Sequence, residues 1–442
     1  MTSAIPGTPL DRARAGLDAC VHCGFCLPAC PTYLALEDEN DSPRGRLVLM
    51  GALLDGRLSL TDEALQHIDQ CLGCRGCETA CPSGVPYGAL LEATRETLAA
   101  RRPLPLRARF VLAVFAREWL LRPALALARL ARGLGLARLG ARVLPQGLAM
   151  PAAMLAATAR PAGARPGIAR PGIARPGASN QPREPRDPGR PPPTRGSAAL
   201  LTGCVMEGLL APVNRATERA LEANGWQLRD APGQRCCGAL HAHAGDAAAA
   251  RELARANIEA FERSDAETVV MNSAGCGSMC KDYGHLLADD ADWAPRAAAF
   301  AARVKDVHEL LAVVVGSDES DEVARPLLVA WDAPCHLQHA QRVTAPPLAV
   351  LQSIPGLTLV PLVDSDQCCG SAGIFTLVQP TVSASVLAPK LARIAESGCE
   401  VVATANPGCL MQIGGGLILS GSKVTARHPV ELLNLRPARP AR

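Results

Sequence analysis

Eight cysteines near the amino end have the types and spacing of redox metal ligands. The run from Cys20 to Pro31 reads C-x-x-C-x-x-C-x-x-x-C-P, and the run from Cys71 to Pro82 repeats it. Three thiolates spaced by two residues can reach three corners of one iron–sulfur cube, whereas the fourth cysteine reaches a neighbouring cube. The pattern therefore predicts two [4Fe-4S] clusters that exchange their fourth ligands.

This rule divides the eight cysteines into two predicted ligand sets. They are Cys20, Cys23, Cys26 and Cys81 for cluster 1, and Cys71, Cys74, Cys77 and Cys30 for cluster 2. Disulfides would require an oxidising compartment, and zinc sites usually present their cysteines in pairs rather than in runs of four. We therefore favour iron–sulfur clusters. Four cysteines already complete each site, so we expect His22 to contact a ligand or face solvent.

Length and composition limit the class of protein. A chain of 442 residues is too long for one core and predicts two to four domains. With 45 basic and 42 acidic residues, it lacks the charge excess of a general nucleic-acid binder. The amino end has no apolar signal segment, and no uncharged apolar run is long enough to span a membrane. We expect a cytoplasmic chain whose 18 cysteines are kept reduced as metal ligands.

Residues 1–100 are predicted to form a mostly helical, two-cluster ferredoxin-like domain. Between the two cysteine runs, Ser42 has the character of an N-cap and Pro43 suits the first helical position, which predicts a helix to about Leu54. A second helix, from Asp62 to Asp69, would lead the chain to Cys71.

Residues 101–145 change to a basic, leucine-rich composition. Ten arginines accompany a single acid, Glu118, and prolines divide the segment into two predicted helices. One interpretation is a basic amphipathic surface that docks on anionic lipid or on an acidic partner. We favour the other, a solvated helix pair that packs on the ferredoxin-like part, because several glycines weaken the helices. The arginines expected on one helical face are Arg122, Arg129 and Arg132.

Residues 146–196 are predicted to be a linker. The sequence Ala-Arg-Pro-Gly recurs at 164, 169 and 174 and is followed by a proline-rich run. Such a composition buries too little apolar surface to fold, so we expect an extended tether.

Residues 197–442 contain a duplicated unit, divided here into 197–320 and 321–442. The landmarks recur at nearly constant offsets: 335 − 204 = 131, 368 − 236 = 132 and 409 − 276 = 133. Short apolar segments alternate with helical ones, which predicts two parallel α/β domains whose ligands follow the strands. The overall fold class is therefore α+β and multi-domain.

Each unit contributes a lone cysteine, a Cys-Cys-Gly turn and a distal cysteine. The two sets are Cys204, Cys236, Cys237 and Cys276, and Cys335, Cys368, Cys369 and Cys409. Gly238 and Gly370 would let the backbone pass close to the sulfur atoms. Four thiolates could hold a further iron–sulfur centre, and the alternative is a metal-free thiol pocket kept for packing.

Several nearby residues are assigned lesser roles. Cys280 forms C-x-x-x-C with Cys276, and Cys399 is expected to be structural. His241, His243 and His336 are expected to form hydrogen bonds or to face solvent. Of the three, His336, next to Cys335, is the best placed to be a metal ligand instead.

A twin-cluster ferredoxin region followed by two Cys-Cys-Gly units resembles the iron–sulfur subunit of glycolate oxidase (glycolate dehydrogenase). The resemblance covers nearly the whole chain, and its most telling stretches are Asp41–Arg46, Cys71–Val85, Thr202–Val205 and Cys335–His339. In that family a separate flavin subunit oxidises glycolate to glyoxylate, and the iron–sulfur subunit passes the electrons toward the respiratory chain.

The resemblance implies an electron-transfer subunit without substrate chemistry or catalytic residues of its own. FAD is then expected only on the partner subunit, with an acceptor such as quinone and with peripheral contact at the inner face of the cell membrane. The related lactate-utilisation and heterodisulfide reductase proteins suggest an alternative, in which a Cys-Cys-Gly centre does the chemistry. A purely regulatory iron–sulfur protein is a third option. The sequence departs from the family's C-x-x-C closing pair, which leaves the ligands of any third centre open.

Overall fold

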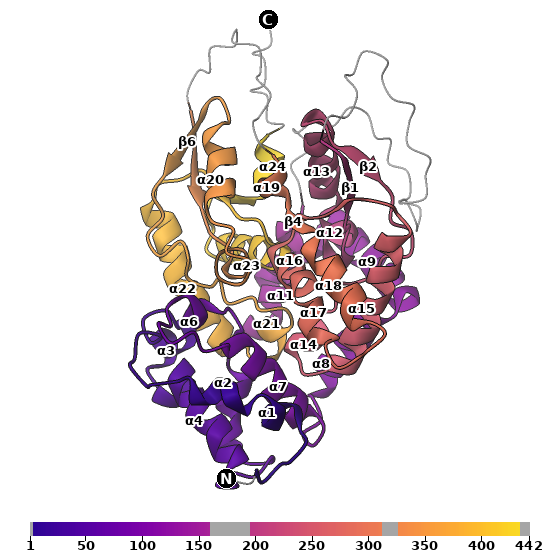
Figure 1. The fold of residues 1–442 in the computed structure, drawn as a ribbon. Helices are drawn as coiled ribbons and strands as arrows, with labels where there is room; N and C mark the ends of the chain where they lie inside the picture. Colours follow the sequence, from indigo (N-terminus) through magenta and orange to yellow (C-terminus); the bar gives the residue numbers. More distant parts are fainter. Residues whose placement is uncertain (1–2, 160–194, 312–325, 434–442) are drawn as a thin grey trace, which may run out of the picture.

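The computed structural model describes residues 3–159, 195–311 and 326–433. A helical amino-terminal part lies below two α/β units that stand side by side (Figure 1). The fold is thus mixed α+β with several domains, as predicted. Of the predicted linker, residues 160–194 lie outside the described residues.

The ferredoxin-like part is built from short helices around one apolar core. Ser42 Oγ accepts a hydrogen bond from the Gly45 amide (2.9 Å) and Pro43 opens the following helix, which confirms the predicted cap. The core includes Met50, Leu53 and Ile68. The elements are α1 (Pro9–Arg12), α2 (Arg14–Asp18), α3 (Pro31–Leu36), η1 (Glu39–Asp41), α4 (Pro43–Leu54), η2 (Glu63–Leu65), α5 (Gln66–Asp69), α6 (Gly76–Thr79) and α7 (Tyr87–Ala99).

Four helices follow before the first strand: α8 (Leu106–Ala116), α9 (Glu118–Gly133), α10 (Leu136–Val143) and α11 (Gln146–Ala157). The prediction of two helices in 101–145 is therefore wrong, and Pro123 lies inside α9 instead of ending a helix. The reason is tertiary anchoring. Arg129 Nη1 and Arg132 Nη1 donate to the carbonyls of Gly208 and Leu209 at 3.1 and 2.9 Å. Helix α9 thus packs on the first α/β unit, whereas the sequence predicts contact with the ferredoxin-like part.

Helix α11 corrects the expectation that the linker begins at residue 146. Its Ala153 and Ala156 are buried, and it packs against a helix of the second α/β unit, α23 (Pro407–Leu419). A methyl group added at Gly415 would lie 3.0 Å from the Met154 amide nitrogen, so the two helices approach closely. The other main partner of α11 is the adjacent α10, and sequence analysis missed the helix because the contact with α23 joins segments far apart in the chain.

Each α/β unit contains a four-stranded parallel sheet, and the two sheets have the same strand order, β2-β1-β3-β4 and β6-β5-β7-β8. This shared topology confirms the duplication. The strands are β1 (Ser197–Leu200), β2 (Gln227–Arg229), β3 (Thr268–Met271), β4 (Val304–Asp306), β5 (Leu327–Trp331), β6 (Leu357–Val360), β7 (Val401–Ala403) and β8 (Thr425–Arg427). The remaining helices are α12 (Cys204–Leu209), α13 (Ala211–Ala223), α14 (Ala239–His243), α15 (Ala247–Glu262), α16 (Ala274–Lys281), α17 (Tyr283–Leu286), α18 (Ala294–Ala302), α19 (Val307–Leu310), η4 (His336–Ala340), α20 (Ala345–Gln352), α21 (Phe375–Val378), α22 (Pro380–Glu396) and α24 (Pro429–Leu432).

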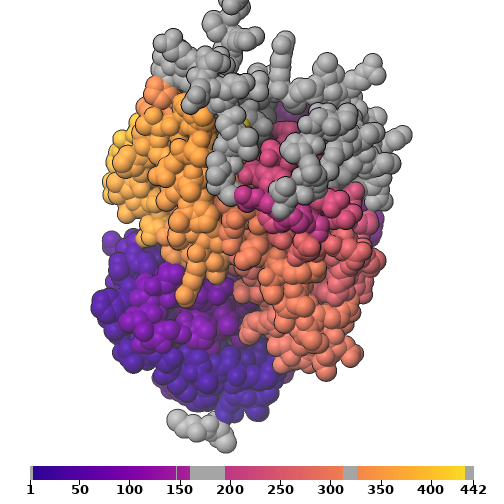
Figure 2. Space-filling model, turned by 45° about the horizontal axis from the view of Figure 1, so that its top comes forward, coloured from indigo at the N-terminus to yellow at the C-terminus, as the bar shows by residue number. Residues whose placement is uncertain are grey.

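The two units and the ferredoxin-like part contact one another directly. One apolar core includes residues of both sheets, and the Ala274 amide donates to the Ala405 carbonyl across the junction (3.0 Å). The ferredoxin-like part lies against both units (Figure 2) and is joined to the first by a salt bridge from Arg251 to Glu96 (2.9 Å). In the parts of the chain that the structure describes, no helix has the length and apolarity to cross a membrane.

The close approach of α11 and α23 predicts that Gly415→Val destabilises the fold. The added side chain must displace Met154, and overpacking of this kind costs about 1–3 kcal/mol. Urea unfolding followed by circular dichroism measures the loss. Leu419→Val, on an exposed position of the same helix, is the matched control. Equal stability of the two variants would contradict the packing of α11 on α23.

Candidate metal centres

The two cysteine runs form loops with matching backbone geometry. His22 and Gly73 both have positive φ (53° and 63°), as do Gly24 and Arg75 (86° and 63°). Each pair is separated by 51 residues, the offset of the cysteines themselves. Positive φ is uncommon outside glycine, so its presence at His22 and Arg75 shows how strictly the loop shape is imposed.

The second run and the last cysteine of the first run meet in one cavity, the second ferredoxin site. It is lined by Cys30, Cys71, Cys74 and Cys77. The other four cysteines line a neighbouring cavity, the first ferredoxin site: Cys20, Cys23, Cys26 and Cys81, with Cys77 also at its border. The structure therefore brings together the members of each predicted set. Cys23 is exposed, whereas Cys30, Cys71 and Cys77 are buried.

Burial works against thiolate formation at the second ferredoxin site. It is the main cause that raises the pKa of Cys77 and of Cys74 well above the usual range. A thiolate is the form that binds metal, so these buried sulfur atoms need a positive charge nearby. Four convergent, buried thiols fit an iron–sulfur cluster, whose iron ions supply that charge.

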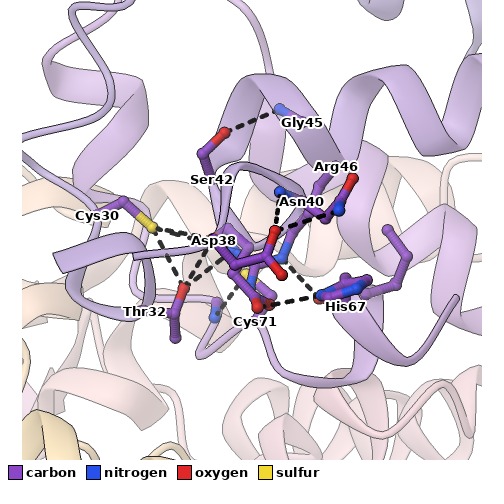
Figure 3. Close-up of polar contacts among 12 residues, drawn as sticks. Cys30, Thr32, Asp38, Asn40, Ser42, Gly45, Arg46, His67 and Cys71 are labelled. Atoms are coloured by element: carbon purple, nitrogen blue, oxygen red, sulfur yellow. Dashed lines mark hydrogen bonds and ion pairs between the residues drawn. The ribbon is translucent and has the colours of Figure 1, made fainter. Parts of the chain in front are cut away.

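A buried arginine provides a further positive charge beside this site (Figure 3). Arg46 is fully buried, and its Nη1 atom lies 3.9 Å from Cys30 Sγ and donates to Thr32 Oγ1 at 3.0 Å. Its Nη2 atom pairs with Asp41 Oδ1 at 2.9 Å. Burial opposes the charge of Arg46, but Cys71, Tyr87, Cys30 and Asp41 raise its pKa above the usual value.

Two neutral donors and one hydroxyl group also contact these sulfur atoms. Tyr87 Oη donates to Cys71 Sγ at 3.6 Å, and the Gly73 amide donates to the same sulfur at 3.4 Å. The hydroxyl of Thr32 lies 3.3 Å from Cys30 Sγ. Hydrogen bonds to cluster ligands are one of the factors that set a reduction potential. Sequence analysis missed Arg46, Tyr87 and Thr32 in this role, and the only signal was a charged residue on the apolar face of α4.

Asp38, Asp41 and His67 place one potential ligand atom each within 4.8 Å of one another. Asp41, however, already pairs with Arg46 and lies 3.0 Å from His67 Nδ1. The carboxylate of Asp38 accepts the Asn40 amide as a helix cap. These contacts account for the three side chains without a metal ion.

The four cysteines of the second α/β unit form the second Cys-Cys-Gly site. Cys335 Sγ and Cys368 Sγ lie 4.0 Å apart, and Cys369 Sγ and Cys409 Sγ lie 3.2 Å apart. Gly370 has φ 82°, and a methyl group there would lie 2.7 Å from the Ser383 carbonyl oxygen, so the turn requires glycine. The Cys335 thiol, as a hydrogen-bond donor, holds the pKa of Cys368 well below the usual value.

The corresponding cysteines of the first unit form the first Cys-Cys-Gly site. Cys204 Sγ lies 3.5 Å from Cys236 Sγ and, as donor, lowers the pKa of Cys236. Cys237 likewise lowers the pKa of Cys276, so all four thiols interact. Cys276 lies in the first turn of α16, and Ser273 Oγ caps that helix by accepting its amide.

A buried lysine distinguishes the second Cys-Cys-Gly site from the first. Lys390 Nζ pairs with Asp332 Oδ1 at 2.9 Å, and both side chains are about 2% exposed. Burial opposes the charge, but Asp332, Cys369 and Cys409 raise the pKa of Lys390. The glycine turns contact Ala250 in the first unit and Ser383 in the second (383 − 250 = 133), so the first unit has Asn257 at the position of Lys390 and Leu201 at that of Asp332.

The second Cys-Cys-Gly site borders the second ferredoxin site. Cys74, Cys335 and Cys368 belong to one packed cluster with Leu72. His336 Nε2 lies 3.0 Å from the Gly73 carbonyl oxygen. Burial is the main cause that lowers the pKa of His336 to about 4, and the charge of nearby His243 is the second. His336 thus joins the two sites by a hydrogen bond, a contact that the sequence could not reveal.

The first Cys-Cys-Gly site lies next to α8. Buried His241 Nε2 lies 3.0 Å from the Leu112 carbonyl oxygen, and Arg235 Nη2 donates to the Ala116 carbonyl at 2.7 Å. His241 therefore forms the expected hydrogen bond. Buried Cys399 contacts the Ile394 carbonyl in the core, in line with its structural role, and Cys280 is buried one turn beyond Cys276.

Comparison with known proteins agrees with this organisation. A family model for a 4Fe-4S dicluster domain matches residues 16–85, and one for a cysteine-rich domain matches residues 198–281 and 329–414. The chain is 35% identical to a Bacillus subtilis protein described as a probable glycolate oxidase iron-sulfur subunit, over 94% of this chain and 92% of that protein. It is 32% identical to the Escherichia coli glycolate oxidase iron-sulfur subunit, over 96% and 94%. Lactate utilization protein A of an Exiguobacterium species is 35% identical over 54% of this chain and 97% of its own.

The contacts of Arg46 and Tyr87 predict their effect on the potential of one cluster. Tyr87→Phe removes a donor to Cys71, and Arg46→Met removes the buried cation, so reduction should become harder at that cluster. We expect a downward shift on the order of 60 mV for Arg46→Met, a tenfold change for a one-electron couple. Asp41→Asn should shift the potential upward. Redox titration followed by EPR measures all three.

Arg57→Gln is the matched control, because exposed Arg57 lies just after the same helix, pairs with Asp55 and lines neither cavity. Iron content and thermal unfolding identify any variant that loses its fold. An unchanged potential in folded Tyr87→Phe and Asp41→Asn would contradict the role given to this network.

Proposed function

Since this chain belongs to the glycolate oxidase iron-sulfur subunit family, we propose that it carries electrons from glycolate, oxidised to glyoxylate on a separate FAD-containing subunit, to a respiratory acceptor of the quinone class. The observation that supports this most is the pair of cavities, each lined by one complete set of four cysteines. We place the chain in the cytoplasm, in peripheral contact with the membrane.

The proposed ligands of cluster 1 are the cysteines of the first ferredoxin site, and those of cluster 2 are the cysteines of the second. Bound there, the [4Fe-4S] clusters supply one-electron redox chemistry between the two-electron flavin and the acceptor. The protein's own residues hold the thiolates in place, stabilise their charge through Arg46 and shield the second site from water. We propose the two Cys-Cys-Gly sites as the positions of further centres.

The exposure of the two ferredoxin sites suggests where the flavin subunit docks. Cys23 is exposed at the first site, and the neighbouring Val21 and Phe25 are 68% and 64% exposed. The second ferredoxin site is buried. It lies between the first ferredoxin site and the second Cys-Cys-Gly site. We therefore propose that the flavin subunit covers the loop of Val21 and Phe25.

The match to lactate utilization protein A supports a second candidate substrate. That protein aligns with about half of this chain, so a lactate-oxidising complex, with chemistry at a Cys-Cys-Gly centre, is the alternative. Growth of a deletion strain on glycolate and on lactate separates the two. Loss of growth on glycolate alone is the expected result. Loss on lactate alone would contradict the proposal.

The exchange of the fourth ligands predicts which cysteines bind the same cluster. Cys30→Ser should disturb the same EPR signal as Cys71→Ser, although Cys30 belongs to the first run. Cys81→Ser should disturb the same signal as Cys20→Ser. Low-temperature EPR of dithionite-reduced protein measures this. Buried Cys399→Ser, outside all four sites, is the control. Grouping of Cys30 with Cys20 would refute the assigned sets.

The exposed loop predicts where partner binding fails. Phe25→Asp places a charge in an apolar contact, so affinity for the FAD-containing subunit should fall at least about tenfold, equal to about 1.4 kcal/mol. Co-purification of the coexpressed subunits and glycolate-dependent dye reduction measure the effect. Val363→Asp, at an exposed apolar residue of the second unit, is the control. Binding that resists Phe25→Asp would rule out this docking surface.

A further inference from the structure

Helix α9 is amphipathic in the opposite sense to an ordinary surface helix. Its apolar face, which carries Trp119, Leu127, Leu130 and Leu134, is turned outward, and each of these side chains is at least 57% exposed. The spacing i, i+8, i+11, i+15 keeps the four residues on one side of the helix. Two arginines instead point toward the protein and bind carbonyl groups at the end of α12. This helix exposes the face that most surface helices bury.

The same arrangement continues along the neighbouring helices. In α10 the buried residues are Ala137 and Ala141, while the larger apolar side chains are exposed. Of the 19 exposed large apolar residues in the described parts of the chain, 11 lie between positions 106 and 148. We call these 11 the outer apolar face: Leu106, Phe110, Trp119, Leu127, Leu130, Leu134, Leu136, Leu139, Val143, Leu144 and Leu148.

The charges around this face have one sign. Exposed arginines interleave with the apolar residues, and Glu118, paired with Arg122 at 2.6 Å, is the single acid among residues 101–145. The remaining exposed arginines of this segment are Arg101, Arg107, Arg109, Arg117, Arg138 and Arg142. A partner for this surface must therefore be apolar and must carry negative charge.

The composition of residues 101–145 favours a lipid bilayer over a folded protein as the partner. Residues 101–145 contain no Ser, Thr, Asn, Gln, Tyr or His. Protein–protein interfaces typically form about ten directional hydrogen bonds, and this segment has few side chains able to form them. Basic helices with Leu, Phe and Trp on their apolar face are the kind that lie in the interface of a lipid bilayer. Tryptophan is especially favoured at that depth.

We propose that the outer apolar face lies in the headgroup region of a bilayer containing anionic phospholipid. This inference deepens the peripheral membrane contact proposed above by naming the surface and the lipid chemistry that it recognises. The arginines contact lipid phosphates, and the leucines enter the boundary of the acyl chains. Helix α8, which carries part of this face, contacts His241 and Arg235 beside the first Cys-Cys-Gly site, so docking brings that site toward the lipid phase.

Co-sedimentation with lipid vesicles tests the proposal on the full-length, cluster-containing chain. The chain should bind vesicles of equal parts phosphatidylcholine and phosphatidylglycerol, and binding to phosphatidylcholine alone should be weaker. Leu127→Glu with Leu130→Glu should lower the partition onto anionic vesicles at least tenfold. Arg138→Gln with Arg142→Gln should reduce the preference for anionic lipid. On binding, Trp119 fluorescence should shift to shorter wavelength, as identified by comparison with Trp119→Phe.

The matched control is Val363→Glu with Leu419→Glu, which places two acids at exposed apolar residues elsewhere. Equal binding by this control and by the Leu127/Leu130 double variant would overturn the proposal. Two other results for the Leu127/Leu130 double variant would also overturn it. One is dissociation of a dimer in sedimentation velocity, and the other is loss of binding to the FAD-containing subunit. Glycolate-dependent dye reduction by the complex without lipid tests the electron-transfer function separately. Its absence in the wild-type complex would reject that function and leave the vesicle result standing.

Discussion

Crowding of cysteine sulfur atoms is the constraint on which this structure depends. Sulfur atoms from segments up to 40 residues apart lie 3.2–4.0 Å from one another at the two Cys-Cys-Gly sites. Thiolates at such distances repel strongly in a buried environment, so protons or metal ions must reduce their charge. The strands, the helices and the positive-φ turns hold these groups in place. Metal binding and folding are therefore expected to be linked.

The protein also balances this charge with buried cations. Arg46 lies at the second ferredoxin site and Lys390 at the second Cys-Cys-Gly site, and each is neutralised by one aspartate. Removing one member of such a buried pair leaves an uncompensated charge, which is far more costly than losing an exposed salt bridge. The two adjoining sites thus share a design in which a fixed ion pair lies beside the thiols.

The sequence was most informative where residues act within a short segment. The cysteine spacing, the Ser42–Pro43 helix start and the duplicated landmarks each depend on neighbours along the chain, and the corresponding local structure is present. It was least informative where a distant contact decides the outcome. Helix α11 is held by α23, Arg129 and Arg132 anchor α9 on the first α/β unit, and His336 reaches Gly73 across 263 positions. No periodicity in one segment encodes a partner in another.

The duplication explains why two similar sites have different surroundings. Both units keep four cysteines, a glycine turn and one strand order, because these features are needed to gather the thiols. Outside that set the copies differ: the second has the Lys390–Asp332 pair and contacts the ferredoxin-like part through His336. The first has Asn257 and Leu201 at those positions and contacts α8 through His241 and Arg235. A buried ammonium and carboxylate carry charge beside the second site that an amide and a leucine side chain do not, so electrostatics alone makes the two sites unequal.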